Sequence, residues 1–264
     1  MTSPEPLPDD PEVLLRPATA EDGEALASVH LASRKGATPP MPPSVHPDED
    51  VLPWVTGWLA EEGEVWIAEV AGDPAGYARF TSSWLDQLYV VPEHAGKGIG
   101  SLLLDLGKSL RPGGFALWVF ESNEPARRFY RRHALLELET TDGSGNDEQS
   151  PDVRMAWPGT DPMAYLRAQV DEVDDDLAMV LARRAALTAA IQQYKEVPGH
   201  AGRDPGREAE IAARMARHAP ALGEPGLRRI VHEIITVSLD AAAVHDDLAG
   251  DPEQSVGGSR QGPP

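Results

Sequence analysis

Residues 163–195 read MAYLRAQVDEVDDDLAMVLARRAALTAAIQQYK, and this stretch decides the fold of the second half of the chain. It contains no Pro or Gly, and its apolar residues return at steps of three and four, the period of an amphipathic helix. They are Leu166, Val170, Val173, Leu177, Val180, Leu181, Leu187 and Ile191. At 1.5 Å per residue the helix would be about 50 Å long, too long for one small domain to cover. We therefore predict an antiparallel homodimer in which a second copy covers the overhang.

The predicted helix carries cations at Arg167, Arg184 and Lys195. Arg184 and Lys195 are eleven residues apart, so on one continuous helix they differ by about 20° in azimuth and can face one pocket. Arg167 precedes Arg184 by seventeen residues, which is about 25 Å along the axis and about 100° around it. We expect Arg167 to reach the partner's pocket. Cations placed in this way in an acidic chain suggest a site for an anionic small molecule.

Two further helices are predicted after the long one. Asp204 before Pro205 is a helix-start signal, with Asp204 as the N-cap, and it places Arg207 and Glu208 in the opening turns. The last helix is predicted from about residue 225 to 248, and Ser238 lies on its apolar stripe. That stripe consists of Leu227, Ile230, Val231, Ile234 and Ile235. A polar Ser on an apolar face is suited to line a cavity.

In this order, the positions resemble the helical (type II) chorismate mutases over about residues 161–248. The matching positions are Leu166, Arg167, Asp174, Leu177, Arg184, Lys195, Arg203, Asp204, Arg207, Glu208, Ile234, Ile235 and Ser238. The resemblance implies an all-α three-helix domain that forms an intertwined dimer. It also implies conversion of chorismate to prephenate, with no cofactor.

This reaction is a unimolecular Claisen rearrangement, so the enzyme must fold its substrate and stabilise the charge that develops at the breaking ether. By the resemblance, Arg184 and the partner's Arg167 hold the two carboxylates of chorismate, because Arg forks fit carboxylates. Lys195 would donate to a carboxylate and to the ether oxygen.

The resemblance also assigns the remaining polar positions. Ser238 would assist Arg184, Glu208 would accept from the ring hydroxyl, and Asp204 and Arg207 would shape the pocket. One turn after Ser238, where the family commonly has Gln or Glu as a second partner for the ether oxygen, this chain has Ala242. Two alternatives therefore stay open: a non-catalytic dimerisation or chorismate-sensing module, and an isochorismate-pyruvate lyase.

The first half of the chain contains a strand, a glycine-rich turn and a helix in succession. Residues 85–92 read LDQLYVVP, and residues 93–104 read EHAGKGIGSLLL. Such a turn aims several backbone N–H groups at one point, and the helix that follows adds its dipole. The segment is therefore suited to hold a pyrophosphate.

With its surroundings, this segment resembles the GNAT acetyltransferases over about residues 12–157. The motifs that carry the resemblance are Val91-Pro92, Gly96 to Gly100, the strand at 115–120, Asn123, and Ala126 to Tyr130. The resemblance implies an α+β fold with a mixed sheet and flanking helices. It implies acetyl-CoA as the cofactor and an amine as the acetyl acceptor.

By the same resemblance, two groups of residues bind the cofactor. Backbone amides would cradle its pyrophosphate at Gly96, Gly98, Ile99, Gly100 and Ser101. A strand edge would pair with its pantetheine arm at Tyr89, Val90 and Val91. Asn123 would contact the cofactor near its reactive end, and Tyr130 would protonate the departing thiolate. Ala134 stands where the family usually has a glycine.

The acceptor amine and its general base remain open from the sequence, with Asp86, Glu93, His94 and Glu121 as candidate bases. The Pro-rich segment 36–50 falls where this fold places a substrate-covering loop.

Composition sets further bounds. A length of 264 residues allows two domains, which we place at 12–157 and 161–248, with disordered tails at 1–11 and 250–264. There is no Cys, which excludes disulfides and thiolate catalysis, and the His spacing suggests no metal site. A net charge of −20 argues against nucleic-acid binding. Neither a signal peptide nor a transmembrane run is evident, so we expect a cytoplasmic protein without a membrane partner.

Overall fold

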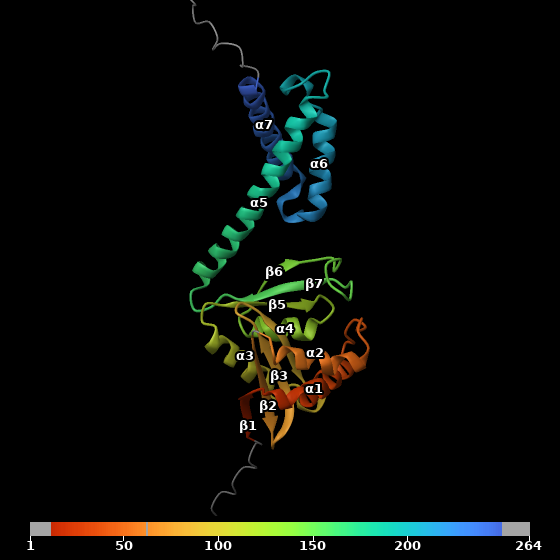
Figure 1. The fold of residues 1–264 in the computed structure, drawn as a ribbon, viewed down its shortest axis with the longest axis vertical. Coiled ribbons are helices and arrows are strands. Elements are labelled where there is room, and N and C mark those ends of the chain that lie inside the picture. Colours follow the sequence, from red (N-terminus) through yellow and green to blue (C-terminus); the bar gives the residue numbers. More distant parts are fainter. Residues whose placement is uncertain (1–11, 62, 250–264) are drawn as a thin grey trace, which may run out of the picture. The chain divides into compact units, whose positions relative to one another are not determined.

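The computed structural model describes residues 12–61 and 63–249 (Figure 1). The disordered tails predicted at 1–11 and 250–264 lie outside these described residues. The chain divides into two compact units, Met1–Ala168 and Gln169–Pro264. No helix among the described residues is long and apolar enough to span a membrane.

The first unit contains two antiparallel sheets. One has the order β1-β2-β3-β4 and the other β5-β7-β6. Their strands are β1 (Val13–Pro17), β2 (Glu64–Val70), β3 (Asp73–Phe80), β4 (Leu85–Val90), β5 (Phe115–Phe120), β6 (Leu136–Thr140) and β7 (Asp152–Trp157). An isolated parallel bridge between Trp84 and Ala116 links the two sheets beside β4 and β5.

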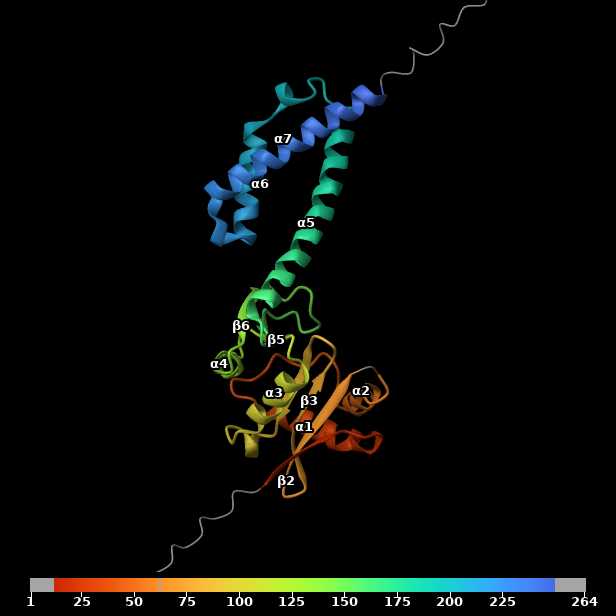
Figure 2. The ribbon, with the colours of Figure 1, turned by 90° about the vertical axis from the view of Figure 1, so that its left-hand side faces the viewer.

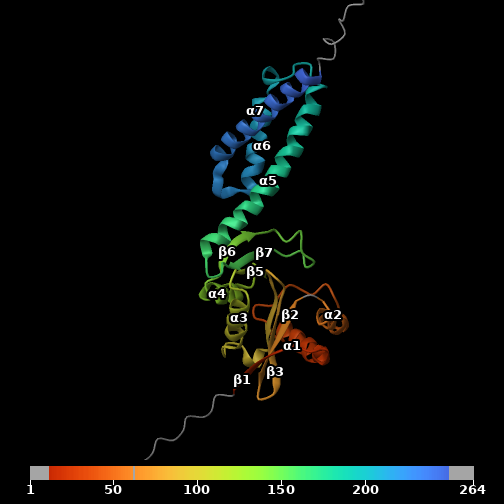
Figure 3. The same ribbon diagram turned by 60° about the vertical axis from the view of Figure 1, so that its left-hand side comes forward.

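Helices cover both faces of the first sheet (Figure 3). Those on its faces are α1 (Gly23–Gly36), α2 (Val51–Trp58) and α3 (Ile99–Leu110), whereas α4 (Glu124–Arg132) contacts β6 of the second sheet. Strand side chains alternate between faces, so Ile67 and Tyr77 pack with α1 and α2. Their neighbours Ala68 and Ala78 pack in the cluster that includes α3. Each large apolar side chain buried in these clusters contributes about 1.5–3 kcal/mol.

Short 3₁₀ turns connect several of these elements. They are η1 (Ala20–Asp22), η2 (Asp48–Asp50), η3 (Pro92–His94), η4 (His200–Gly202) and η5 (Pro220–Leu222). After α4, Ala134 adopts a φ of 62°, so the left-handed turn forms although this position lacks glycine. Left-handed backbone costs a residue with a Cβ about 1–2 kcal/mol.

The second unit is helical, with α6 (Pro205–His218), α7 (Gly223–Ala249) and, from Gln169 onward, α5 (Pro162–Gln192) (Figure 2). Buried Ala212, Leu227 and Val231 join α6 to α7. No residue of α5 is buried, and its apolar side chains at Val170, Val173, Leu177, Val180, Leu187 and Ile191 are 49–63% exposed. The apolar stripe of α5 thus lacks a covering partner within the described residues of one chain.

The structure confirms an α+β fold followed by a helical domain. It also confirms Asp204 as the N-cap of α6, because its side chain accepts from the backbone N–H of Arg207 at 3.0 Å. The predicted end of the long helix is wrong, since α5 stops at Gln192. Lys195 lies in the turn that follows, where its N–H donates to the Gln192 carbonyl. Pro198 and the left-handed Gly199, at a φ of 68°, redirect the chain just beyond.

Candidate functional sites

A cavity of about 960 Å³ lies in the first unit, beside β4, β5 and the start of α3. Most of the predicted cofactor residues line it: Tyr89, Val90, Gly96, Gly98, Gly100, Ser101 and Asn123. Tyr130, the predicted acid, lines it as well. Val91 and Ile99 are not lining residues: the Val91 N–H donates to the Ala75 carbonyl at 3.0 Å, and the Ile99 side chain belongs to the core.

The glycine-rich turn leaves room for a ligand. Gly96 and Gly98 have φ angles of 77° and 89°, a conformation that glycine adopts without strain. A Cβ added at either position would meet no atom within 4 Å. Gly98 is the N-cap of α3, and the first N–H groups of a helix have no intrahelical acceptors. The turn therefore borders open space with backbone N–H groups that lack intrahelical acceptors, an arrangement suited to bind an anion.

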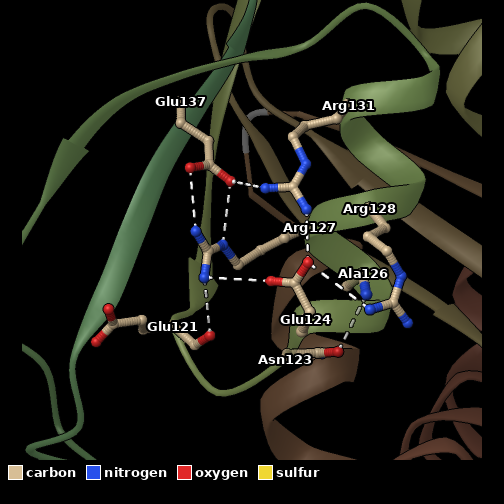
Figure 4. A network of polar contacts seen from close by, with 8 residues as sticks. All are labelled: Glu121, Asn123, Glu124, Ala126, Arg127, Arg128, Arg131 and Glu137. Atoms are coloured by element: carbon tan, nitrogen blue, oxygen red, sulfur yellow. Dashed lines mark hydrogen bonds and ion pairs between the residues drawn. The ribbon is translucent and has the colours of Figure 1, made fainter.

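Asn123 has a structural role in addition to its place in the cavity. As the N-cap of α4 it accepts from the Ala126 N–H at 3.2 Å. Figure 4 shows the same helix end tied to β6 by ion pairs. Arg127 donates to both carboxylate oxygens of Glu137 at 3.1 and 3.0 Å, and its hydrogen bonds lower the pKa of Glu137. Capping and ion pairs fix α4, and with it Tyr130.

The Tyr130 side chain is buried, at 8% exposure. Burial raises the pKa of its phenol above the ordinary value, followed by a smaller effect of Tyr89. The group therefore keeps its proton near neutral pH and can present it to the sulfur of a departing thiolate.

Sequence reasoning missed His133, which also lines the cavity. Its Nε2 lies 3.0 Å from the Ser101 Oγ, and Lys108 donates to its backbone carbonyl at 2.7 Å. Burial, followed by the charge of Lys108, lowers the pKa of its ring. His133 follows Tyr130 by three residues, about one helical turn, and this spacing could have indicated that both side chains lie on the same face.

The candidate general bases separate into two groups. Asp86 and His94 line the cavity, whereas Glu93 and Glu121 are not among its lining residues. Burial raises the pKa of Asp86, and the nearby Arg79 opposes that effect. A carboxyl with a raised pKa is better matched to taking up a proton near neutral pH.

His30 makes folding stability depend on pH. Burial, followed by the charge of Arg34, lowers its pKa from 6.5 to about 4. Its ring also meets Tyr77, Trp54 and Tyr89. Between these two pKa values the unfolded chain binds a proton that the folded chain does not. The contribution is therefore complete above pH 6.5 and decreases as the pH falls.

We expect this linkage to lower the free energy of unfolding by about 2 kcal/mol between pH 7 and pH 5. Urea unfolding at the two pH values would measure it, with His30→Gln as the comparison. The variant should lose this part of the pH dependence. An equal change in both proteins would contradict the assignment.

In the second unit, Arg184 and Ser238 come together from α5 and α7. The Arg184 Nη1 donates to the Ser238 Oγ at 3.1 Å, and that hydroxyl donates to the Ile234 carbonyl at 2.6 Å. Ser238 is buried, whereas Arg184 is only half-buried. The hydroxyl thus orients a guanidinium that still has open donors.

Two other predicted ligands of the substrate have partners within the chain. The Lys195 Nζ donates to the Gly202 carbonyl at 2.5 Å. Glu208 accepts from the Nε and Nη2 of Arg203 at 2.8 and 2.7 Å, and these bonds lower the pKa of Glu208. Arg203 also donates to the Thr236 hydroxyl at 2.9 Å. Sequence reasoning gave Arg203 no role, and the structure shows that it anchors Glu208 to α7.

The remaining predicted residues take no part in these contacts. Arg207 is exposed and pairs with Glu210 at 3.1 Å. Arg167 is exposed near the start of α5 and belongs to the first unit. Ala242 is buried on α7, so no polar side chain follows Ser238 one turn later.

Comparisons with known proteins assign both parts of the chain. The model of the acetyltransferase (GNAT) family matches residues 32–134, and the model of chorismate mutase type II matches residues 166–242. An uncharacterized N-acetyltransferase of Archaeoglobus fulgidus is 31% identical over 107 residues, which are 34% of this chain and 72% of that protein. The peptidyl-lysine N-acetyltransferase YjaB of Salmonella typhimurium is 33% identical over 72 residues, 27% of this chain and 49% of that protein.

Among solved structures, apo-form YjaB from Escherichia coli is 22% identical, with a TM-score of 0.47 and coverage of 56% of this chain and 99% of its own. The chain belongs to the GNAT N-acetyltransferase family, and a type II chorismate mutase domain follows its acetyltransferase domain.

Proposed function

We propose that the chain is a bifunctional enzyme. Its mutase domain, at 161–248, converts chorismate to prephenate, and its acetyltransferase domain, at 12–157, transfers an acetyl group from acetyl-CoA to an amine. Support for the first activity comes mainly from the contact between Arg184 and Ser238. Support for the second comes from the open glycine turn beside Tyr130 in one cavity.

In the proposed mutase site, Arg184 binds one carboxylate of chorismate with its free donors. Lys195 carries a formal positive charge and has one backbone partner, so it can exchange that carbonyl for the substrate. Its ammonium would then donate to a carboxylate and to the ether oxygen, where negative charge develops. Glu208, held by Arg203, accepts from the ring hydroxyl. Asp204 and Arg207 shape the entrance at the start of α6.

The site would be completed by a second copy of the chain. The apolar stripe of α5 is exposed along its length, and covering such a stripe contributes about 25 cal/mol per Å². A second α5, antiparallel to the first, is the occupant we propose. It would bring the partner's Arg167 to the carboxylate that Arg184 leaves free, giving two shared sites.

Mixed dimers test this shared site. Arg167→Ala and Arg184→Ala should each inactivate the mutase when alone. After mixing and subunit exchange, about a quarter of the sites should regain both arginines. Chorismate consumption before and after mixing would measure the recovery. Absence of recovery in dimers proven to exchange would exclude a cross-chain role for Arg167.

Ala242 favours one rival function. Because a buried apolar side chain stands one turn after Ser238, the ether oxygen has one donor fewer. A domain that binds chorismate without converting it would fit this observation. Calorimetry would show binding for this rival, with no loss of chorismate over hours. Release of pyruvate from isochorismate would instead indicate a lyase.

For the acetyltransferase, the residues present fit acetyl-CoA. The amides of Gly96 to Ser101 would hold the pyrophosphate, and the edge of β4 at Tyr89 and Val90 would pair with the pantetheine arm. Acetyl-CoA supplies the acetyl group as a thioester. Asn123 fixes the start of α4, and Tyr130 provides the proton for the leaving sulfur.

A further inference from the structure

Two hydrogen-bond donors of α1 lie one helical turn apart and face the cavity. His30 and Arg34 both line it, as expected for residues four positions apart on a helix. The His30 side chain is 4% exposed, and its Nδ1 lies 2.9 Å from the Tyr77 hydroxyl. Because Nδ1 is engaged with Tyr77, Nε2 is the ring nitrogen that can serve the cavity that His30 lines.

The buried Tyr77 hydroxyl decides which nitrogen of His30 carries the proton. Tyr77 is fully buried, and its described hydrogen-bond partner is the His30 Nδ1. A buried hydroxyl left without an acceptor costs about 1–3 kcal/mol, so this hydroxyl donates to Nδ1. The neutral ring then carries its own proton on Nε2. His30 thus offers an N–H donor to the cavity.

Arg34 adds a second set of donors. Its side chain is 16% exposed, and its Nη2 lies 3.6 Å from the Glu148 carboxylate. The same nitrogen donates to the Pro42 carbonyl at 3.0 Å. Burial raises the pKa of the nearby Tyr89, and the charge of Arg34, followed by a hydrogen bond from its side chain, opposes that effect. A guanidinium has five N–H donors, more than its contacts with Pro42, Glu148 and Tyr89 use. A guanidinium with open donors beside a second N–H matches the geometry of a carboxylate.

The same end of the cavity has an apolar wall and negative charge. Trp54 is 47% exposed. The centroid of its ring lies 5.3 Å from that of the His30 ring and 4.4 Å from that of the Trp58 ring. Met41 and Val45 also line this cavity. Its lining carboxylates include Asp50, Asp147 and Glu148. A ligand here meets donors, an aromatic face and acidic groups together.

We propose that the acetyl acceptor is a free α-amino acid with a large apolar side chain. Its carboxylate accepts from Arg34 and His30, its side chain packs on Trp54, and the acidic residues attract its ammonium. This inference rests on the proposed acetyltransferase function. The amine nitrogen forms a bond to the acetyl carbon as the carbon–sulfur bond breaks. Tyr130 gives its proton to the sulfur; of the two protons that the ammonium loses, one restores the Tyr130 phenol and one goes to solvent.

A comparison of substrates tests this on the unmodified protein. With acetyl-CoA present, release of the free thiol is followed with L-phenylalanine, L-phenylalaninamide and L-alanine. We expect kcat/KM for phenylalanine to exceed that for the amide, which lacks the carboxylate, by about 10-fold or more. It should also exceed that for alanine by about 10-fold. Equal rates for the acid and its amide, or turnover confined to lysine side chains in peptides, would overturn the proposal.

Variants test the carboxylate contact of Arg34 and the side-chain contact of Trp54 separately. Arg34→Met should lower kcat/KM for phenylalanine about 30-fold or more and lower that for the amide much less. Lys35→Met is the matched control, because Lys35 pairs with Asp48 and is not a lining residue. Trp54→Ala should reduce the preference for phenylalanine over alanine. Equal losses for acid and amide in Arg34→Met would contradict the carboxylate contact.

Calorimetry with acetyl-CoA distinguishes a failure of the acceptor assignment from a failure of the proposed acetyltransferase function. If acetyl-CoA binds but no amino acid is acetylated, the acceptor assignment fails and the acetyltransferase function stands. If acetyl-CoA does not bind, the proposed acetyltransferase function itself fails.

Discussion

Lys195→Ala is expected to lower kcat for chorismate about 10²- to 10³-fold, the usual loss when one preorganised donor is removed from a developing charge. Ala242 stands where a second polar side chain would assist, so that position supplies no donor in place of Lys195. Lys195 is exposed, so the fold should persist. Chorismate absorbance and thermal unfolding, measured on the same samples, would separate lost catalysis from lost structure.

Arg184→Ala should have an effect of similar size, because it removes the guanidinium that Ser238 orients. Arg183→Ala is the matched control, because Arg183 precedes Arg184 directly, its side chain is exposed, and it has no assigned role. A control as inactive as Arg184→Ala, or a Lys195→Ala enzyme close to wild-type turnover, would refute the proposed site.

Gly98→Glu is expected to abolish acetyl-CoA binding. A carboxylate would enter the open space at the N-terminus of α3 and compete with the pyrophosphate for the same amides while repelling its charge. Calorimetric titration with acetyl-CoA would measure the loss.

Two controls isolate the cause. Gly98→Ala imposes the same backbone strain at a φ of 89° without the charge, so it should weaken binding much less. Gly113→Glu adds an equal charge at an exposed loop glycine with open space around it and should bind normally. Unchanged affinity in Gly98→Glu would reject the glycine turn as the cofactor site.

Local sequence patterns predicted that the helices form better than they predicted where the long helix ends. The three-and-four spacing of apolar residues identified α5, and Asp204 before Pro205 identified the start of α6, because both signals lie within a few residues. The end of α5 depends on how Pro198 and Gly199 redirect the chain. Lys195, which was predicted on the helix, therefore lies in the turn after it. The pairing of Arg203 with Glu208 and Thr236 joins α6 to α7, a contact that periodicity does not reveal.

The same distinction holds for the acetyltransferase site. The glycine turn and Tyr130 were predicted because a family motif surrounds them. His30 and Arg34 carry no motif, since their significance arises only when α1 packs beside β3 and β4. The hydrogen bond of His30 to Tyr77 spans 47 residues of sequence, so its tautomer and its low pKa are properties of the folded chain.

We propose that the mutase site is active although Ala242 stands where the family commonly has a polar side chain. Incubating the purified protein with chorismate, following ultraviolet absorbance and converting the product with acid to phenylpyruvate tests this most directly. We expect rapid turnover to prephenate by the wild type and its loss in Lys195→Ala. Chorismate that stays bound but unconverted would contradict the claim and assign the helical domain to sensing or dimerisation.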